Sequence, residues 1–271
     1  AHQSINRIIR GVGENRESQG IYFVDAADEF ARQSPHNCPG FELFFDHVHP
    51  VFSGNYLLAK TIFGRVEQIL PDKIKAQKNV AAAFPSESMC ARQLAFTDFD
   101  RLRVTQTNLE IISKRQPFIN QAYHKEATAF WTRKLDQLKN IISPDALAEA
   151  IEQYEQVIKL NSTDYYLRQD YAKVLHMDKN YTYLAAKQCR LIIEQIPFDF
   201  STLAMLAKME AQLGNVDSAL EHAVMATKYM PMDFKANQIA GTLYQKNGQY
   251  GKAQRYIAEA VRLNPKFVPG Y

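Results

Sequence analysis

The sequence predicts an α/β segment followed by an all-α superhelix of helical hairpins. Short apolar runs alternate with helical patterns within residues 1–70, and this alternation is typical of a parallel sheet covered by helices. Small residues, glycines and prolines recur every 34 residues in the C-terminal part. A fixed period of this length indicates stacked helix pairs, each of which buries its apolar face against its neighbours.

The N-terminal elements are expected in the order helix, strand, helix, strand, helix. The runs at 20–25 (GIYFVD) and 41–46 (FELFFD) have the apolar and aromatic content of buried strands. A helical stretch at 26–33 separates them, and apolar residues at helical spacing follow from 53 to 69. The helix before the first strand is expected to have an inner face made of Ile5, Ile8, Ile9 and Val12. Because a parallel sheet needs cover on both faces, these strands are expected to belong to a larger sheet.

Polar residues with catalytic potential follow the second apolar run. From residue 46 the chain reads DHVHPVFSGNYLLA, with Asp46 three residues before His49, and with Pro50 and Gly54 shortly after. This block resembles the last conserved block of SGNH/GDSL-type hydrolases, in which a strand leads into Asp-x-x-His-Pro and a glycine follows. The longer string looks especially like bacterial hydrolases of this class that carry helical repeats.

The resemblance implies an esterase site in which His49 is the general base and acid, and Asp46 orients it. A serine hydroxyl is a weak nucleophile, so an imidazole must take its proton while a carboxylate fixes the imidazole tautomer. Pro50 favours extended backbone at His49, which keeps that residue out of the following helix. His47 has the wrong spacing from Asp46 for this role. The alternative is that Asp46 and His49 are ordinary polar residues of the surface.

The nucleophile of this hydrolase class is not found in the sequence. The resemblance implies a Gly-Asp-Ser block near the start of the domain, and an oxyanion hole with a Gly and an Asn from later blocks. The N-terminal serines have other neighbours: Ser4, Ser18, Ser34 and Ser53. We therefore expect residues 1–78 to be the C-terminal portion of such a domain, and this chain alone to be inactive as an esterase.

Residues 79–142 are predicted to form a helical connector. The helical pattern breaks at Phe96–Thr97, and Thr97 followed by Asp100 is typical of a capping box at the start of a new helix. Pro117 is expected to start another helix over 118–140, with the single tryptophan, Trp131, in the core.

Residues 143–271 are predicted to begin with one further helix that covers a repeat array. Ser143 can cap this helix and Pro144 suits its first position. Its apolar stripe consists of Ala150, Tyr154, Val157 and Ile158.

The array itself shows a period of 34 residues, which links Pro197, Pro231 and Pro265, and also Ala185, Ala219 and Ala253. This is the period of the tetratricopeptide (TPR) repeat, a helix–turn–helix unit. It predicts repeats at 166–197, 200–231 and 234–265. Within the last repeat, Gly241 and Ala253 are small enough for two helices to approach closely, and Gly248 can adopt the positive φ that ends a helix.

The first helices of TPR repeats line a concave groove. On this face the sequence offers polar and mildly basic side chains: Lys208, Gln212, Lys235, Gln238, Gln245 and Lys246. Such a groove would suit an acidic peptide or the free C-terminus of a polypeptide as partner, and the alternative is a plain solvated face.

Composition excludes several other function classes. The net charge of +3 is too small to indicate nucleic acid, and no run of 18 apolar residues predicts a membrane span. The three cysteines, and the histidines His2, His36, His124, His176 and His222, fit no metal-binding pattern, so no metal or cofactor is expected. The start, AHQSINRIIRG, lacks the apolar core of a signal peptide, and the sequence leaves the compartment open. Two functions remain: an SGNH-type hydrolase of an ester, such as a carbohydrate O-acyl group, and a non-catalytic TPR scaffold that binds a protein.

Overall fold

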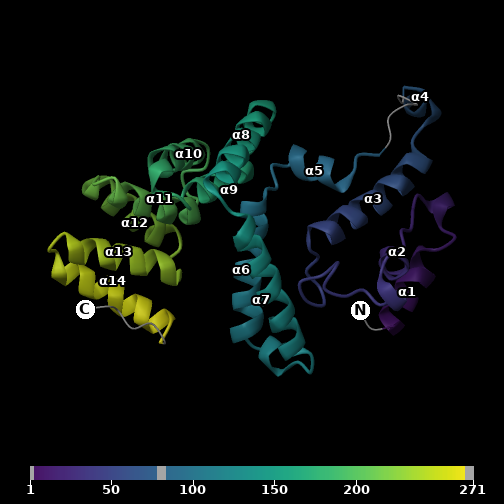
Figure 1. Ribbon diagram of the computed structural model, residues 1–271, viewed down its shortest axis with the longest axis horizontal. Coiled ribbons are helices and arrows are strands. Elements are labelled where there is room, and N and C mark those ends of the chain that lie inside the picture. The colour runs from purple at the N-terminus through teal and green to yellow at the C-terminus, as the bar shows by residue number, and fades with distance from the viewer. Residues whose placement is uncertain (1–2, 78–83, 266–271) are drawn as a thin grey trace. The chain divides into compact units, whose positions relative to one another are not determined.

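A computed structural model describes residues 3–77 and 84–265 of the chain (Figure 1). The chain divides into two compact units: residues 1–96 with 101–141, and residues 97–100 with 142–271. In the first part of the chain the α-helices are α1 (Gln3–Gly13), α2 (Ala26–Arg32), α3 (Phe52–Ile69), α4 (Asp72–Lys75), α5 (Glu87–Gln93), α6 (Asp98–Lys114) and α7 (His124–Ile141). The second part contains α8 (Pro144–Leu160), α9 (Tyr165–Leu175), α10 (Thr182–Gln195), α11 (Phe200–Gln212), α12 (Val216–Tyr229), α13 (Phe234–Lys246) and α14 (Tyr250–Leu263).

The predicted α/β architecture of the N-terminal segment is wrong. No β-strand forms within residues 3–77 and 84–265, where the only sheet-like pairing is an antiparallel bridge between Phe44 and Pro50. A strand is stable only when its backbone groups find hydrogen-bonding partners on a neighbour. The segment at 41–46 folds back locally instead, and its Phe45 N–H donates to the His49 carbonyl at 2.8 Å. The helices expected at 26–33 and 53–69 are confirmed as α2 and α3.

The apolar face expected for the first helix is not buried. Helix α1 forms, but Ile5, Ile8, Ile9 and Val12 are between 52% and 66% exposed. The prediction of an inner face fails because the sheet that it was to cover does not form among the described residues. Instead, Arg10 attaches α1 to the following segment by donating from Nε to an Asp25 carboxylate oxygen at 2.5 Å.

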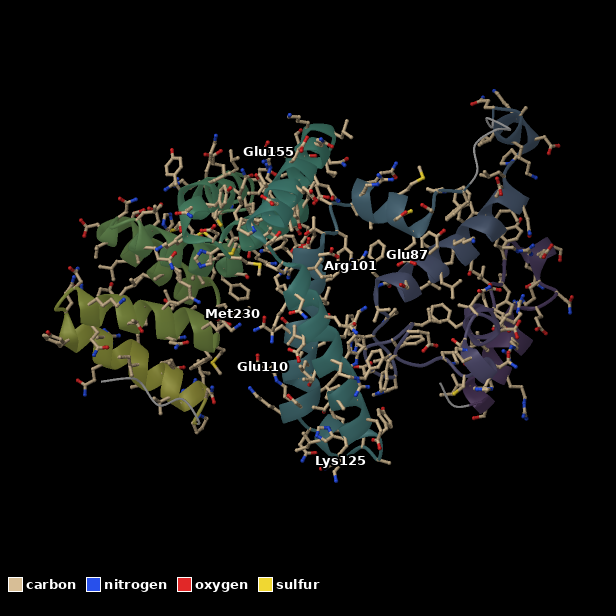
Figure 2. All side chains as sticks on the ribbon, in the orientation of Figure 1. Glu87, Arg101, Glu110, Lys125, Glu155 and Met230 are labelled. Atoms are coloured by element: carbon tan, nitrogen blue, oxygen red, sulfur yellow. The ribbon has the colours of Figure 1, made fainter. Side chains whose placement is uncertain are left out.

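An aromatic cluster forms part of the core of the first unit, and it confirms that Trp131 is a core residue. Trp131 on α7 is buried with Ile112 of α6 and Ala127, and the Phe45 ring packs 4.8 Å from the Trp131 ring. The indole Nε1–H donates to the Phe45 carbonyl at 3.1 Å. This contact attaches the loop at 41–51 to α7. In the same unit, the Arg101 guanidinium (labelled in Figure 2) lies 4.8 Å from the centre of the Phe96 ring.

For the connector, the predicted break in the helical pattern at Phe96–Thr97 is confirmed. The last predicted helix is corrected, because it begins later than expected. Helices α5 and α6 are separate, and the Thr97 N–H and hydroxyl both donate to an Asp100 carboxylate oxygen, at 3.0 and 2.7 Å. The predicted helix over 118–140 is shorter at its start. A 3-10 turn at Phe118–Asn120 ends at Gln121, whose extended backbone (ψ 142°) interrupts the helix before α7 begins at His124.

The second unit consists of α8 and three helix pairs: α9 with α10, α11 with α12, and α13 with α14 (Figure 1). The second helices of the pairs begin at residues 182, 216 and 250, which reproduces the spacing of 34. Helix α8 begins as expected, since the Ser143 hydroxyl accepts from the Ala146 N–H at 3.1 Å. The Tyr154 ring on α8 stacks on Tyr171 of α9 at 5.0 Å, so α8 covers the first pair.

Two features of the turns follow from residue type. Gly214 and Gly248 have φ values of +83° and +71°, a conformation that glycine adopts without strain, and the value at Gly248 confirms the positive φ predicted for that turn. At the start of each first helix stands an aspartate whose carboxylate accepts from the backbone of the first turn: Asp164, Asp199 and Asp233. Aspartate is a preferred N-cap residue, and it also complements the positive end of the helix dipole.

Gly241 allows the close approach of α13 and α14 that its sequence position indicates. A Cβ at this position would lie 2.6 Å from Cγ1 of Ile257 and 3.1 Å from its backbone nitrogen. Gly241→Ala is therefore expected to destabilise the last pair by about 1–3 kcal/mol through overpacking. Hydrogen exchange of α13 and α14 amides measures this loss. Gly251→Ala is the control, because nothing lies within 4 Å of a Cβ there, and equal effects of the two changes would contradict the packing account.

Candidate functional site

A pocket of about 270 Å³ lies on the second unit, between the first helices of consecutive pairs. Its lining comes from the C-cap of α9, from one face of α11 and from the first half of α13: His176, Phe200, Ser201, Ala204, Met205, Lys208, Asp233, Lys235 and Ile239. The residues from α11 are spaced by three or four positions, so they share one helix face. The pocket therefore combines an apolar wall with cationic groups.

Two lysines give the pocket a positive character. Lys208 is exposed overall, yet partial burial lowers the pKa of its ammonium group, and the positive charge of Lys235 lowers it further. Like charges are brought together here, and the lining holds no acidic group that pairs with both of them. Asp233, the acidic residue in the lining, caps α13, where its carboxylate accepts from the Ala236 N–H at 2.6 Å.

His176 is the unusual residue of the pocket. Its Nδ1 is buried and has no hydrogen-bond partner among the described residues. Burial lowers the pKa of the imidazole, and the charge of Lys208 lowers it further. No sequence pattern indicated this environment, because His176 belongs to no motif and fits no metal-binding pattern. The prediction for His2 lies outside the described residues.

Of the six groove residues predicted from the sequence, the structure brings Lys208 and Lys235 into this pocket. The other four are not part of its lining: Gln212, Gln238, Gln245 and Lys246. Met205, Ile239 and His176 could have been found only by knowing which helix faces meet, because no sequence motif marks them. A binding role for the six residues stays a prediction.

In the first unit, Asp46 and His49 form the hydrogen-bonded pair that the sequence suggested. His49 Nδ1 lies 2.7 Å from an Asp46 carboxylate oxygen, and the other oxygen accepts from the backbone N–H groups of Val48 and His49 at 2.7 and 2.9 Å. The Asp46 side chain is 7% exposed and that of His49 is 68% exposed. Burial by itself would raise the pKa of Asp46, but the hydrogen bonds from Val48 and His49 outweigh it and lower the pKa. The carboxylate is therefore ionised and oriented toward an accessible imidazole.

Steric crowding explains why a glycine stands at position 54, shortly after the Asp46–His49 pair. A Cβ at Gly54 would lie 2.2 Å from the Leu43 carbonyl oxygen, so only glycine lets the start of α3 approach the loop. The His47 ring lies 6.4 Å from the ring of Phe118.

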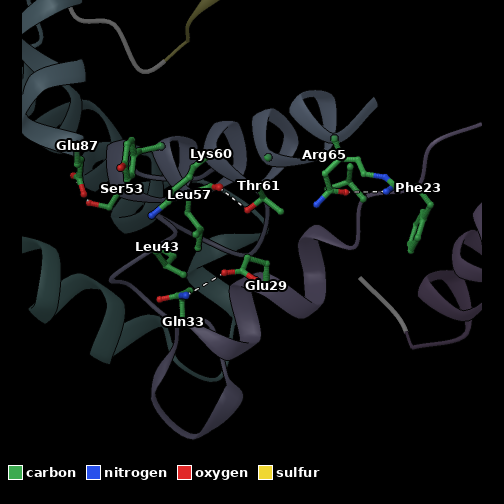
Figure 3. A pocket seen from close by; sticks show the side chains of 14 residues that line it. Phe23, Glu29, Gln33, Leu43, Ser53, Leu57, Lys60, Thr61, Arg65 and Glu87 are labelled. Atoms are coloured by element: carbon green, nitrogen blue, oxygen red, sulfur yellow. Dashed lines mark hydrogen bonds between the residues drawn. The ribbon is translucent and has the colours of Figure 1, made fainter. Parts of the chain in front are cut away.

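A larger pocket of about 620 Å³ lies beside α2 and α3 (Figure 3). Several polar side chains that line it are bonded to one another or to nearby groups. Glu29 accepts from Gln33 at 3.1 Å, and Ser53 donates to Glu87 at 2.7 Å. Neither Asp46 nor His49 belongs to its lining. In the described part of the chain, no cluster of three His, Cys, Asp or Glu side chains could hold a metal ion. None of the described helices has the length and apolarity needed to cross a bilayer.

Comparison with known proteins relates the last helix pair, α13 and α14, to one repeat family. A tetratricopeptide repeat model matches residues 234–267. Among solved structures, the chain is similar to a crystal structure of MamA (17% identity, TM-score 0.44, covering 68% of this chain and 98% of that one). It is also similar to MamA from Desulfovibrio magneticus RS-1 (15%, 0.42, 66% and 97%), and to YrrB, described as a TPR protein with an unusual peptide-binding site (17%, 0.42, 62% and 82%). No curated protein matches the sequence, and none of these comparisons points to an SGNH-type hydrolase. The pair α13–α14 thus matches the tetratricopeptide repeat, and the two pairs before it share its spacing.

Proposed function

We propose that this chain is a protein-interaction module that binds a peptide segment of a partner in the pocket between α9, α11 and α13. The observation that carries the proposal is the pocket itself, which is lined by residues of α11 and α13 and by His176 at the C-terminal end of α9. Because a peptide that lies across these helices would contact every repeat, recognition would use the array and not a single helix pair.

The lining supports a peptide more than a small metabolite. The volume of about 270 Å³ falls just below the usual range for drug-sized ligands, which is about 300–1,000 Å³. It is large enough for one or two side chains. Met205 and Ile239 offer apolar contact, while Lys208 and Lys235 offer polar contact at the same place.

A selection from a random phage-displayed peptide library on the immobilised full chain tests this function. We expect peptides that bind the chain and that lose binding when Lys208 and Lys235 are replaced together by glutamate. A selection that yields only peptides indifferent to these changes would contradict a binding site in this pocket.

We also propose a second function, favoured by the 2.7 Å bond between Asp46 and His49. With its Nδ1 engaged by the carboxylate, His49 keeps Nε2 for proton transfer, which is the arrangement that activates a serine nucleophile in ester hydrolysis. No serine of this sequence stands in a Gly-Asp-Ser block. The serine, like the acylated substrate, would therefore come from outside this sequence.

Reaction with a fluorophosphonate checks this second function. Intact mass spectrometry is expected to show no added probe on the present chain. A polypeptide that supplies the Gly-Asp-Ser block ahead of it should gain one probe, and His49→Ala should abolish that gain while His47→Ala preserves it. Equal labelling of the His49→Ala variant would exclude a catalytic role for the pair.

A further inference from the structure

We propose that the pocket between α9, α11 and α13 binds a carboxylate that adjoins an apolar side chain, and that His176 makes this binding tighter as the pH falls. This inference rests on the proposed peptide-binding function and names the chemistry and the regulation of that same site. It is carried by the position of two ammonium groups, one imidazole and an apolar wall around one small cavity.

The cavity is small enough for its charges to act together on one anion. A sphere of the observed volume is about 8 Å across, which is close to the Debye length at physiological salt, so lining charges are only partly screened from a group inside. Burial and repulsion by Lys235 already lower the pKa of Lys208. A carboxylate between the two lysines would relieve that repulsion. The side chain next to this carboxylate in the peptide would meet the apolar part of the lining, which consists of Phe200, Met205 and Ile239.

His176 supplies the pH dependence because it is uncharged in the free protein near neutral pH. Its pKa is lowered by burial and by Lys208, and its buried Nδ1 has no partner in the described part of the chain. An anion in the pocket would favour the imidazolium form, since an opposite charge nearby raises the pKa of a histidine. By linkage, the free protein must gain a proton on binding, so affinity rises as the pH falls.

The other charged groups around His176 do not reverse the predicted rise in affinity as the pH falls. Lys208 faces it from α11, and Asp233 and Lys235 line the same pocket from α13. On its own helix, Lys173 is paired with Asp170 at 3.0 Å. Two charged residues of the helices packed on α9 have other partners: Glu155 of α8 (labelled in Figure 2) accepts from Tyr171, and Arg190 of α10 pairs with Glu210. With two lysines and one aspartate, the lining has one net positive charge, and protonation of His176 adds a second.

The test uses two hexapeptides on the full chain at constant ionic strength, each labelled on its N-terminal amine with tetramethylrhodamine, whose charge does not change between about pH 6 and pH 8. One is Leu-Glu-Leu-Glu-Glu-Leu with a free terminal carboxylate, and the other has glutamine for glutamate and an amidated end. Between about pH 8 and pH 6 the glutamates stay ionised, so the titrating group belongs to the protein. Fluorescence anisotropy is expected to show about tenfold tighter binding of the acidic peptide, and a further gain toward low pH of up to about tenfold per unit of pKa change.

In the variant His176→Gln, the ratio of the affinities for the acidic peptide at about pH 6 and about pH 8 is expected to fall to about one. Nuclear magnetic resonance of the His176 imidazole in the unaltered chain gives an independent readout, with a higher pKa expected when the acidic peptide is bound. Equal affinity for the two peptides, or no binding of either, overturns the carboxylate inference. A pH dependence that survives in His176→Gln overturns the role of His176. Library peptides that depend on the pocket but lack acidic residues would sink this inference and leave the proposed function standing.

Discussion

Glu210→Ala is expected to destabilise the second unit by about 3 kcal/mol, since removal of one partner from a buried ion pair costs about 3–5 kcal/mol. Glu210 on α11 is 2% exposed. One carboxylate oxygen accepts from Arg190 of α10 at 2.6 Å, and the other accepts from the side chain of Asn215, just before α12, at 2.6 Å. Alanine would leave both donors without this acceptor. We expect a cost at the lower end of this range because the Arg190 side chain is 37% exposed, so water can solvate its guanidinium group once Glu210 is removed.

Hydrogen exchange of α11 and α12 amides in the full chain measures this loss. Glu210→Gln retains one acceptor oxygen and should cost less, and Glu221→Ala, at an exposed position of α12, should change stability by less than about 0.5 kcal/mol. Burial by itself would raise the pKa of Glu210, but hydrogen bonds from Asn215 and Arg190 outweigh it and lower the pKa. A lowered folded-state pKa stabilises the protein above the unfolded pKa, and this contribution disappears as the pH falls through the folded value. If Glu210→Ala behaves like Glu221→Ala, the ion pair does not hold the helices together.

Replacing Lys208 and Lys235 together by glutamate is expected to weaken the binding of the acidic hexapeptide by about 100-fold or more. Like charges placed opposite each other across an interface cost several kcal/mol, and each 1.4 kcal/mol is a factor of ten in affinity. Two attractive contacts become repulsive in one small pocket. Fluorescence anisotropy with the labelled peptide gives the dissociation constants.

The matched control changes the net charge equally but away from the pocket. Lys187 on α10 and Lys228 on α12 are exposed residues of second helices and are not in the pocket lining. Replacing both by glutamate should weaken binding only by long-range repulsion, which salt screens. If the two double variants lose the same affinity, the pocket does not recognise the peptide's charge.

The helical repeats could be predicted from the sequence because their signals are local. Gly214 and Gly248 mark turns that need positive φ, and Gly241 marks a contact that excludes a side chain. Each of these requirements acts on one residue and belongs to a pattern that returns every 34 positions, so no knowledge of the tertiary structure is needed. The hydrogen bond between Asp46 and His49 is also local, since the two residues are three positions apart, although its expectation came from the resemblance to SGNH/GDSL-type hydrolases.

The predicted sheet failed because a strand depends on partners that the segment does not itself contain. The runs at 20–25 and 41–46 have strand-like composition, but they do not pair with each other in the structure. The exposed isoleucines of α1 follow from the same failure. The role of His176 could not be predicted either, because its surroundings depend on residues from α11 and α13 that lie 24 positions or more away in the sequence.

The measurement that tests the peptide-binding account most directly is the methyl spectrum of the protein with ¹³C-labelled methionine, recorded during a titration with a selected peptide. Met205 lines the pocket, whereas Met209 is fully buried beside Cys189, with the two sulfur atoms 3.8 Å apart, and Met89 lies on α5 of the other unit. The account predicts that the Met205 signal, identified by Met205→Leu, shifts with the peptide concentration while those of Met209 and Met89 stay in place. A titration that moves Met89 and leaves Met205 unchanged would contradict it.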